Sequence, residues 1–206
     1  MYSSAANFNI GGTLNSANKT LVSVLNLNTV NAKDLNLKGL WEAGNLTLTA
    51  VNSLQQAGAI YAQNNLALQA NAMSLTGAVQ AGHKLNANAV QQLTVDSQAQ
   101  LFSSDSIELS ADAIQLDGYA GAENSMTAIA ANNLTAGTTA QLESNGLIAL
   151  QSKNADIDLQ GKTYAQNQMI SAQKNLNIAA GASVTTVGDL NITADTLNNT
   201  GAVNTQ

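Results

Sequence analysis

The sequence predicts an all-β chain wound into a parallel β-solenoid, with about 20 residues per coil and roughly nine or ten coils. The first indication is a set of glycines whose spacings are mostly one or two coils: Gly58, Gly77, Gly118, Gly137, Gly161, Gly181 and Gly201. The second is that apolar and polar residues alternate between them with a period of two, which is typical of strands. The third is the composition. Aromatic residues make up 3% of the chain and the apolar residues are mainly small aliphatics, which suits a narrow, uniform interior.

A single coil is clearest in residues 45–62. Leu46 and Leu48 alternate with polar residues in a first strand, Leu54 marks a second strand, and Ile60 follows the Gly58 corner in a third. Each coil therefore holds three short strands separated by turn residues. Consecutive coils should pair in parallel at ~4.8 Å per coil, so that ten coils make a rod of roughly 45–50 Å.

The same phase continues along most of the chain. The coils after the first clear one are expected to start at Leu66, Leu85, Ile107, Met126, Leu147, Met169 and Leu190. Upstream, the repeat continues with less regular spacing, at Phe8, Ile10 and Leu27. We therefore divide the chain into a loosely repeating coil or cap region, residues 1–24, and a regular β-helix, residues 25–206.

Asparagine is placed regularly in this repeat, directly before a strand-leading leucine, at Asn45, Asn65, Asn133 and Asn175. Asparagine and glycine tolerate left-handed backbone conformations and so serve corners. Stacked asparagines can also hydrogen-bond along a ladder. Corner chemistry is the simpler interpretation, and contact with a glycan is the functional alternative.

Charge and residue types exclude several functions. The net charge is −6 and all seven basic residues are lysines, so nucleic-acid binding, which needs basic clusters, is not expected. The chain has no cysteine, and its one histidine, His83, sits at a corner where we expect it to be exposed. No pattern indicates a cofactor, a metal centre or a catalytic triad. Trp41 interrupts the phase, which indicates either a loop or, more simply, local packing.

Carboxylates concentrate within about one coil, at Asp105, Glu108, Asp112, Asp117 and Glu123. Polysaccharide lyases and hydrolases with a β-helix carry such acids, but a lyase site also needs a strongly basic group, commonly arginine. This chain has no arginine. We expect a solvated acidic face with Glu108 pointing outward. A loose Ca²⁺ site is the alternative, and enzymatic activity is the least favoured.

Four aromatic residues form the best binding hypothesis that the sequence offers. Tyr61 and Tyr164 occupy the same phase of the repeat, in GAIYAQNN and GKTYAQNQ, and Tyr119 and Phe102 can join them on one side of the rod. Exposed aromatic rings stack on sugar faces. The plainer interpretation, which we prefer at this stage, is that they cap corners or pack under a neighbouring coil.

The run GNLTLTA…GAIYAQNNLALQA…LTGAVQAG, together with GDLNITADTLNNTGAV near the C-terminus, resembles the repeats of filamentous haemagglutinin-type exoproteins. These are secreted proteins of bacterial two-partner systems and include adhesins, haemolysins and contact-dependent growth inhibition effectors. The resemblance covers roughly residues 25–204 and implies a right-handed parallel β-helix. The NPNGI-type export signal and the VENN-type junction before a toxin domain are not found, so the chain looks like shaft.

The resemblance implies a non-enzymatic shaft segment, secreted or at the bacterial cell surface, that projects a distal adhesive or toxic module. Its implied partner is the outer-membrane transporter that exports the parent chain. The main alternative is a module that itself binds a target-cell receptor or glycan through the side of the β-helix. A polysaccharide lyase or hydrolase is the third candidate. An open apolar coil at each end also predicts end-to-end self-association of the polypeptide, unless terminal residues fold over as caps.

Overall fold

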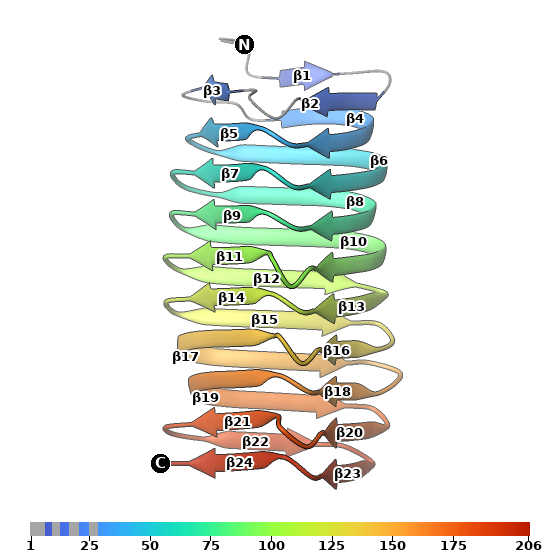
Figure 1. Ribbon diagram of the computed structural model, residues 1–206, viewed down its shortest axis with the longest axis vertical. Coiled ribbons are helices and arrows are strands. Elements are labelled where there is room, and N and C mark those ends of the chain that lie inside the picture. Colours follow the sequence, from blue (N-terminus) through green and yellow to red (C-terminus); the bar gives the residue numbers. More distant parts are fainter. Residues whose placement is uncertain (1–6, 10–12, 17–20, 25–28) are drawn as a thin grey trace.

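The computed structural model describes residues 7–9, 13–16, 21–24 and 29–206, and gives side-chain burial from residue 30 onward. These residues form 24 strands and no helix, and every strand pair is parallel. The coils stack along one long axis (Figure 1). The β-solenoid predicted from the sequence is therefore confirmed. No described segment is a helix able to cross a membrane.

The direction of winding can be followed in Figure 1, where the chain descends from the N-terminus to the C-terminus. The segments at the back run from left to right, and the short arrows at the front run from right to left. A chain that moves in this sense while it descends forms a right-handed solenoid. This is the hand that the resemblance implies.

Each coil contributes one segment to each of three walls. Wall A contains β1 (Asn7–Asn9), β12 (Ser106–Ala111), β15 (Ser125–Ala130) and β22 (Leu190–Thr193). Wall B contains β2 (Thr13–Ser16), β13 (Ala113–Leu116), β16 (Leu134–Ala136), β18 (Ile157–Leu159), β20 (Asn175–Ile178) and β23 (Thr196–Asn199). Wall C contains β3 (Leu21–Val24), β5 (Leu40–Ala43), β7 (Ala59–Ala62), β9 (Ala78–Ala81), β11 (Gln100–Ser103), β14 (Tyr119–Ala122), β21 (Ser183–Thr186) and β24 (Ala202–Thr205).

Six long strands bend around a corner and belong to two walls. The strands β4 (Thr29–Leu37), β6 (Leu46–Gln56), β8 (Leu66–Leu75) and β10 (Lys84–Val95) pass from wall A to wall B. The strands β17 (Gln141–Ser152) and β19 (Lys162–Ala172) pass from wall C to wall A. In most of these strands the pairing register with the neighbouring coil shifts at the corner, so the half of the strand in one wall is paired with a different residue offset from the half in the other wall.

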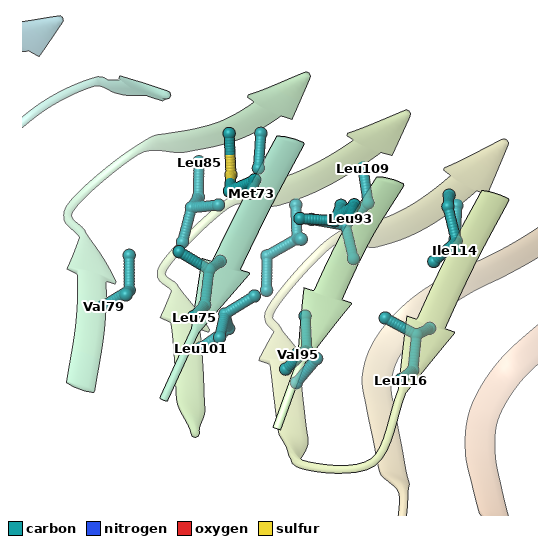
Figure 2. Packing of buried hydrophobic residues seen from close by; sticks show 14 of the residues in the cluster. Met73, Leu75, Val79, Leu85, Leu93, Val95, Leu101, Leu109, Ile114 and Leu116 are labelled. Atoms are coloured by element: carbon teal, nitrogen blue, oxygen red, sulfur yellow. The ribbon is translucent and has the colours of Figure 1, made fainter. Parts of the chain in front are cut away.

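The interior is a stack of aliphatic side chains in register. Leu46 pairs with Leu66, and Leu66 with Leu85, so each leucine lies on its counterpart in the next coil. Figure 2 shows this packing for the middle coils, where Met73, Leu75, Val79, Leu93 and Leu101 point into the same narrow core. No single coil could bury these side chains alone, so stacking is what holds the fold.

The N-terminal strands join the same stack. β1 and β2 pair in parallel with β4, and β3 pairs with β5. Ile10 and Leu27, which the sequence phase includes, lie outside the described residues. The division of the chain at residues 24 and 25 stays a prediction.

The corner between walls B and C alternates between two lengths from β10 onward. In every second coil it is a four-residue turn closed by a backbone hydrogen bond, from Ala99 to Asp96 (2.8 Å), Ala140 to Gly137 (2.9 Å) and Ala182 to Ala179 (3.0 Å). In the coils between, a short corner carries Gly118, Gly161 or Gly201. A Cβ on any of these three glycines would collide with carbonyl oxygens of the long turn in the coil before. Long and short corners therefore fit one another in pairs.

The corner glycines serve close packing of the backbone. A Cβ on Gly58 would overlap the carbonyl oxygen of Gly39, and a Cβ on Gly77 would overlap that of Gly58. Gly181 is the one described glycine with a positive φ, at 91°, and no described residue other than glycine has one. The expectation that corner asparagines such as Asn45 adopt the left-handed conformation is therefore wrong.

The predicted coil starts at Leu147 and Met169 are also wrong, each by one residue. Leu147 is half-buried and the Met169 side chain is 51% exposed, because both point outward from wall A. The inward positions are taken by Ile148 and Gln168, which follow Met126 in register. Each segment has two adjacent apolar residues, Leu147–Ile148 and Met169–Ile170, so the sequence does not show which of them points inward. In the second segment the inward position before Ile170 belongs to a polar residue, Gln168, which the apolar pattern does not indicate.

Candidate functional site

Five of the carboxylates on the rod are engaged by an amide one coil further along the chain. The asparagine Nδ2 donates to the acid in five such pairs: Asp105 with Asn124 (2.7 Å), Asp112 with Asn132 (2.7 Å), Glu123 with Asn145 (2.5 Å), Asp156 with Asn175 (2.9 Å) and Asp158 with Asn177 (2.6 Å). Asn45 and Asn65 form the all-amide version at 3.3 Å, so the predicted asparagine ladder is confirmed there. These contacts hold adjacent coils in register.

The predicted acidic face between Asp105 and Glu123 is not one surface. Its members lie at different corners and walls, and each is held locally. Glu108 points out from wall A, as predicted, and accepts hydrogen bonds from Lys84 Nζ (2.5 Å) and Asn86 Nδ2 (3.3 Å). Asp117 accepts one from Gln115 Nε2 at 2.8 Å. In the described part of the chain, no three acidic or histidine side chains gather closely enough to hold a metal ion.

The two single residues that the sequence singled out have structural positions. His83 is exposed at the corner between β9 and β10, as predicted, and its carbonyl oxygen accepts a hydrogen bond from the buried Ser103 hydroxyl. Trp41 is buried in wall C, where it pairs with Ile60 of the next coil. Its role is packing, and no protruding loop is formed there.

The aromatic candidates come together on wall C. Parallel register places Tyr61, Gln80, Phe102, Gly121, Glu143 and Tyr164 one above another, each one coil from the next. We call these six residues the wall C column. Strand alternation points their side chains outward, because Ile60, Leu101 and the equivalent neighbours point into the core. Three of the four predicted aromatic residues therefore share a single line along the rod.

Tyr119 stands in the neighbouring outward line and reaches across into the column. Its ring covers Gly121, since a Cβ on that glycine would lie 2.7 Å from Tyr119 Cζ. Its hydroxyl donates to Glu143 Oε2 at 3.3 Å. Burial, followed by the charge of Glu143 and its hydrogen bond, raises the pKa of Tyr119 above its usual value. The phenol therefore remains a neutral donor over the physiological range.

Exposure decides what the column offers to a ligand. The Tyr61 side chain is 38% exposed and that of Tyr164 is 46% exposed, while Phe102 and Tyr119 are half-buried. All four lie within strands, so they do not cap corners, whereas the half-buried Phe102 and Tyr119 agree with the other half of the plainer interpretation, packing against neighbouring residues of the wall. They present ring surface and hydrogen-bonding groups on the face of a parallel sheet.

A shallow groove of about 340 Å³ lies at the corner between walls A and B. It forms because the corner at Asn71 is short, whereas the corners of the flanking coils carry the protruding side chains of Val51 and Val90. Gln69 and Asn88 complete its lining. The groove could not be predicted from the sequence, since it depends on differences in corner length between neighbouring coils.

From the sequence alone, only Tyr61 and Tyr164 could be recognised as occupying the same line of the wall C column. Gln80, Gly121 and Glu143 can be assigned to the column only when the length of each coil is known, because neighbours in the column are 19 to 22 residues apart.

Comparison of the chain with protein-family models, with curated proteins and with solved structures finds no match. The assignment of function therefore rests on fold, register and side-chain chemistry.

Proposed function

We propose that the chain is a non-enzymatic shaft segment of a secreted filamentous exoprotein that holds a distal adhesive or toxic module away from the cell. The observation that carries this proposal is the uninterrupted stack, in which one aliphatic core continues through every coil from β4 to β21. A β-solenoid of this kind gains length in proportion to the number of coils. Length and stiffness are the properties that a shaft needs.

The cellular setting of the proposal comes from the resemblance to filamentous haemagglutinin-type repeats. It implies an outer-membrane two-partner transporter as the export partner, and the bacterial surface or medium as the location. The parent protein would be an adhesin or a contact-dependent growth inhibition effector. The absence of cysteine agrees with export that does not depend on disulfide bonds.

Surface display is the property to test first. An antibody raised against the 206-residue polypeptide should label intact producing cells in immunogold electron microscopy. An antibody against a cytosolic protein of the same cells is the control and should label only after lysis. Deleting the partner transporter should remove the surface label. Antigen that is detected only in lysed cells would contradict the proposal.

A second candidate function is recognition of a receptor or glycan by the side of the rod, and the wall C column is the observation that favours it. The fluorescently labelled polypeptide would then bind target cells saturably. The variant Tyr61→Ser/Tyr164→Ser would lose that binding. Unchanged binding would exclude the column as the recognition surface and leave the shaft function untouched.

Enzymatic activity is not part of the proposal. Glu108 forms an exposed ion pair with Lys84 and stands on wall A, away from the wall C aromatics. We expect no release of reducing ends from polysaccharides. Release that Glu108→Gln abolishes would overturn this part of the proposal.

A further inference from the structure

We propose that wall C binds a neutral, linear polysaccharide that lies along the long axis of the rod and stacks its sugar faces on the aromatic residues of the column. This inference rests on the second candidate function, recognition by the side of the rod, and not on the shaft function. It names the ligand class and its direction.

Register gives the site its shape. Tyr61 and Tyr164 are separated by five coil steps in one line, a distance of ~24 Å at the spacing of paired strands. Phe102 lies in the same line, two steps from Tyr61. Because these residues project from a flat parallel sheet, the ring surfaces form a track and not a pocket. A track fits an extended chain better than it fits a compact ligand.

The middle of the track is kept continuous by Tyr119. The column has no side chain at Gly121, and the Tyr119 ring occupies that place between Phe102 and Glu143. The hydrogen bond from Tyr119 to Glu143 fixes the ring from the other side. Aromatic rings therefore lie in two adjacent coils at the centre of the column, from Phe102 and Tyr119. One further ring lies at each end of the column, from Tyr61 and Tyr164.

The polar groups along the track select the charge of the ligand. Gln80 and Glu143 are exposed between the rings, and Glu42 continues the line beyond Tyr61. Amide and carboxylate groups exchange hydrogen bonds with sugar hydroxyls. The carboxylates repel an anionic chain, and Lys162 is the single cation among the outward residues of the described wall C strands. The ligand is therefore a neutral glycan.

The flat wall also selects the shape of the ligand. Tyr61 and Tyr164 keep 38% and 46% of their surface exposed on this wall, with Ala59 beside the first and Lys162 beside the second. A β-1,4-linked polysaccharide is a ribbon that presents the faces of its sugars in one line, which matches a line of rings on a flat surface. The other occupant that a flat sheet face could take is a second copy of this chain, and the experiment separates the two.

The experiment is affinity electrophoresis of the 206-residue polypeptide in gels that contain hydroxyethyl cellulose or galactomannan, both neutral with a β-1,4-linked backbone. Carboxymethyl cellulose supplies the same backbone with negative charge. We expect retardation by both neutral polymers and much less by the anionic one. In calorimetry, cellohexaose should bind more tightly than cellotriose, because the longer chain covers more rings of the track.

The decisive variant is Tyr61→Ser/Tyr164→Ser, which changes two exposed side chains and leaves the core intact. Loss of two aromatic contacts should weaken binding by roughly tenfold or more. The matched control is Val90→Ser/Met169→Ser, whose exposed apolar side chains, 69% and 51% exposed, lie away from wall C. This control should be retarded as strongly as the unmodified chain.

Several results would overturn the inference. They are no retardation by either neutral polymer, stronger retardation by carboxymethyl cellulose, and equal retardation of the tyrosine variant. A dimer that light scattering detects in the unmodified chain and not in the tyrosine variant would show that wall C pairs two copies instead. None of these results touches the shaft proposal, whose test is surface display on intact cells.

Discussion

Tyr119 shows how a single side chain on this rod depends on the coil that follows it. Its ring covers the glycine of its own strand, and its hydroxyl donates to a carboxylate in the next coil. The neutral phenol can donate this hydrogen bond and the phenolate cannot. The contact between the two coils therefore depends on the protonation state of one residue.

The pKa of Tyr119 gives a test at the residue scale. It is raised above 10.0 first by burial and then by Glu143, with a smaller effect of Glu123. Because the folded state favours the proton, this contribution to stability is fully present below pH ~10 and is lost as pH rises through the raised pKa. We expect Glu143→Gln to lower the pKa of Tyr119. Ultraviolet titration of the tyrosines, with Tyr119→Phe to assign the signal, measures it. An unchanged titration would contradict the contact.

The corner glycines give a second test at this scale. In Gly58→Ala the new Cβ collides with the backbone of the preceding coil, which cannot rotate away, so we expect a loss of about 1–3 kcal/mol in stability. In the control Gly137→Ala the nearest atoms belong to the side chains of Asp117 and Gln115, which can move. Thermal unfolding should show a clearly lower Tm for the first variant only. Equal Tm values would mean that close backbone packing does not explain the glycine repeat.

At the scale of the strand, a polar residue can face the core when its own strand and the next coil supply hydrogen-bond partners. In β19, Gln168 is buried although Met169 beside it is apolar. Gln168 Oε1 accepts a hydrogen bond from the buried Thr163 hydroxyl (2.8 Å), and its Nε2 donates to the Thr185 carbonyl oxygen (2.7 Å). A fully paired amide can occupy the core, and the strand phase follows it.

This pair predicts a non-additive effect. Thr163→Val alone leaves Gln168 Oε1 buried without its donor and should cost about 1–3 kcal/mol. Thr163→Val/Gln168→Leu removes both groups and should be more stable than the sum of the single variants predicts. Urea unfolding of the two single variants and the double variant completes the cycle. Strict additivity would show that the two side chains do not act as a pair.

The same strands mark how far sequence reasoning can go. Period-two alternation and the glycine spacing were enough to predict three walls and the coil length, because both follow from backbone geometry. The phase at Leu147 and Met169 could not be predicted, since each segment holds two adjacent apolar residues and, in β19, the inward position belongs to a hydrogen-bonded glutamine. The column of wall C was seen only in part for another reason. Its members are separated by unequal coil lengths, which are set by the corners.

At the scale of the whole molecule, the last coil leaves part of the core uncovered. Leu197 and Val203 continue the inward lines of Leu176 and Val184, yet their side chains are 51% and 37% exposed. Described residues do not fold over them as a cap. The end of this polypeptide is therefore an exposed set of apolar side chains beside unpaired strand edges.

We accordingly expect the 206-residue polypeptide to associate with itself as its concentration rises. Replacing the two side chains in Leu197→Asn/Val203→Asn should weaken this association, because it removes the apolar part of the contact. Multi-angle light scattering over a concentration series measures the effect. A monodisperse monomer at high concentration would contradict the prediction for the unmodified chain.

From β10 onward, the pairing of long and short corners makes two coils the repeat unit of the rod, and this can be tested by duplication. A second copy of residues 107–147, inserted after Leu147, adds one short and one long corner and keeps their alternation. It should fold and lengthen the rod by ~10 Å, measured by small-angle X-ray scattering. A second copy of residues 126–147 adds one coil and stacks a long corner on a long corner. That variant should have a lower Tm, because no glycine lies under the four-residue turn. If both insertions are tolerated equally, the corners are independent and a single coil is the repeat unit.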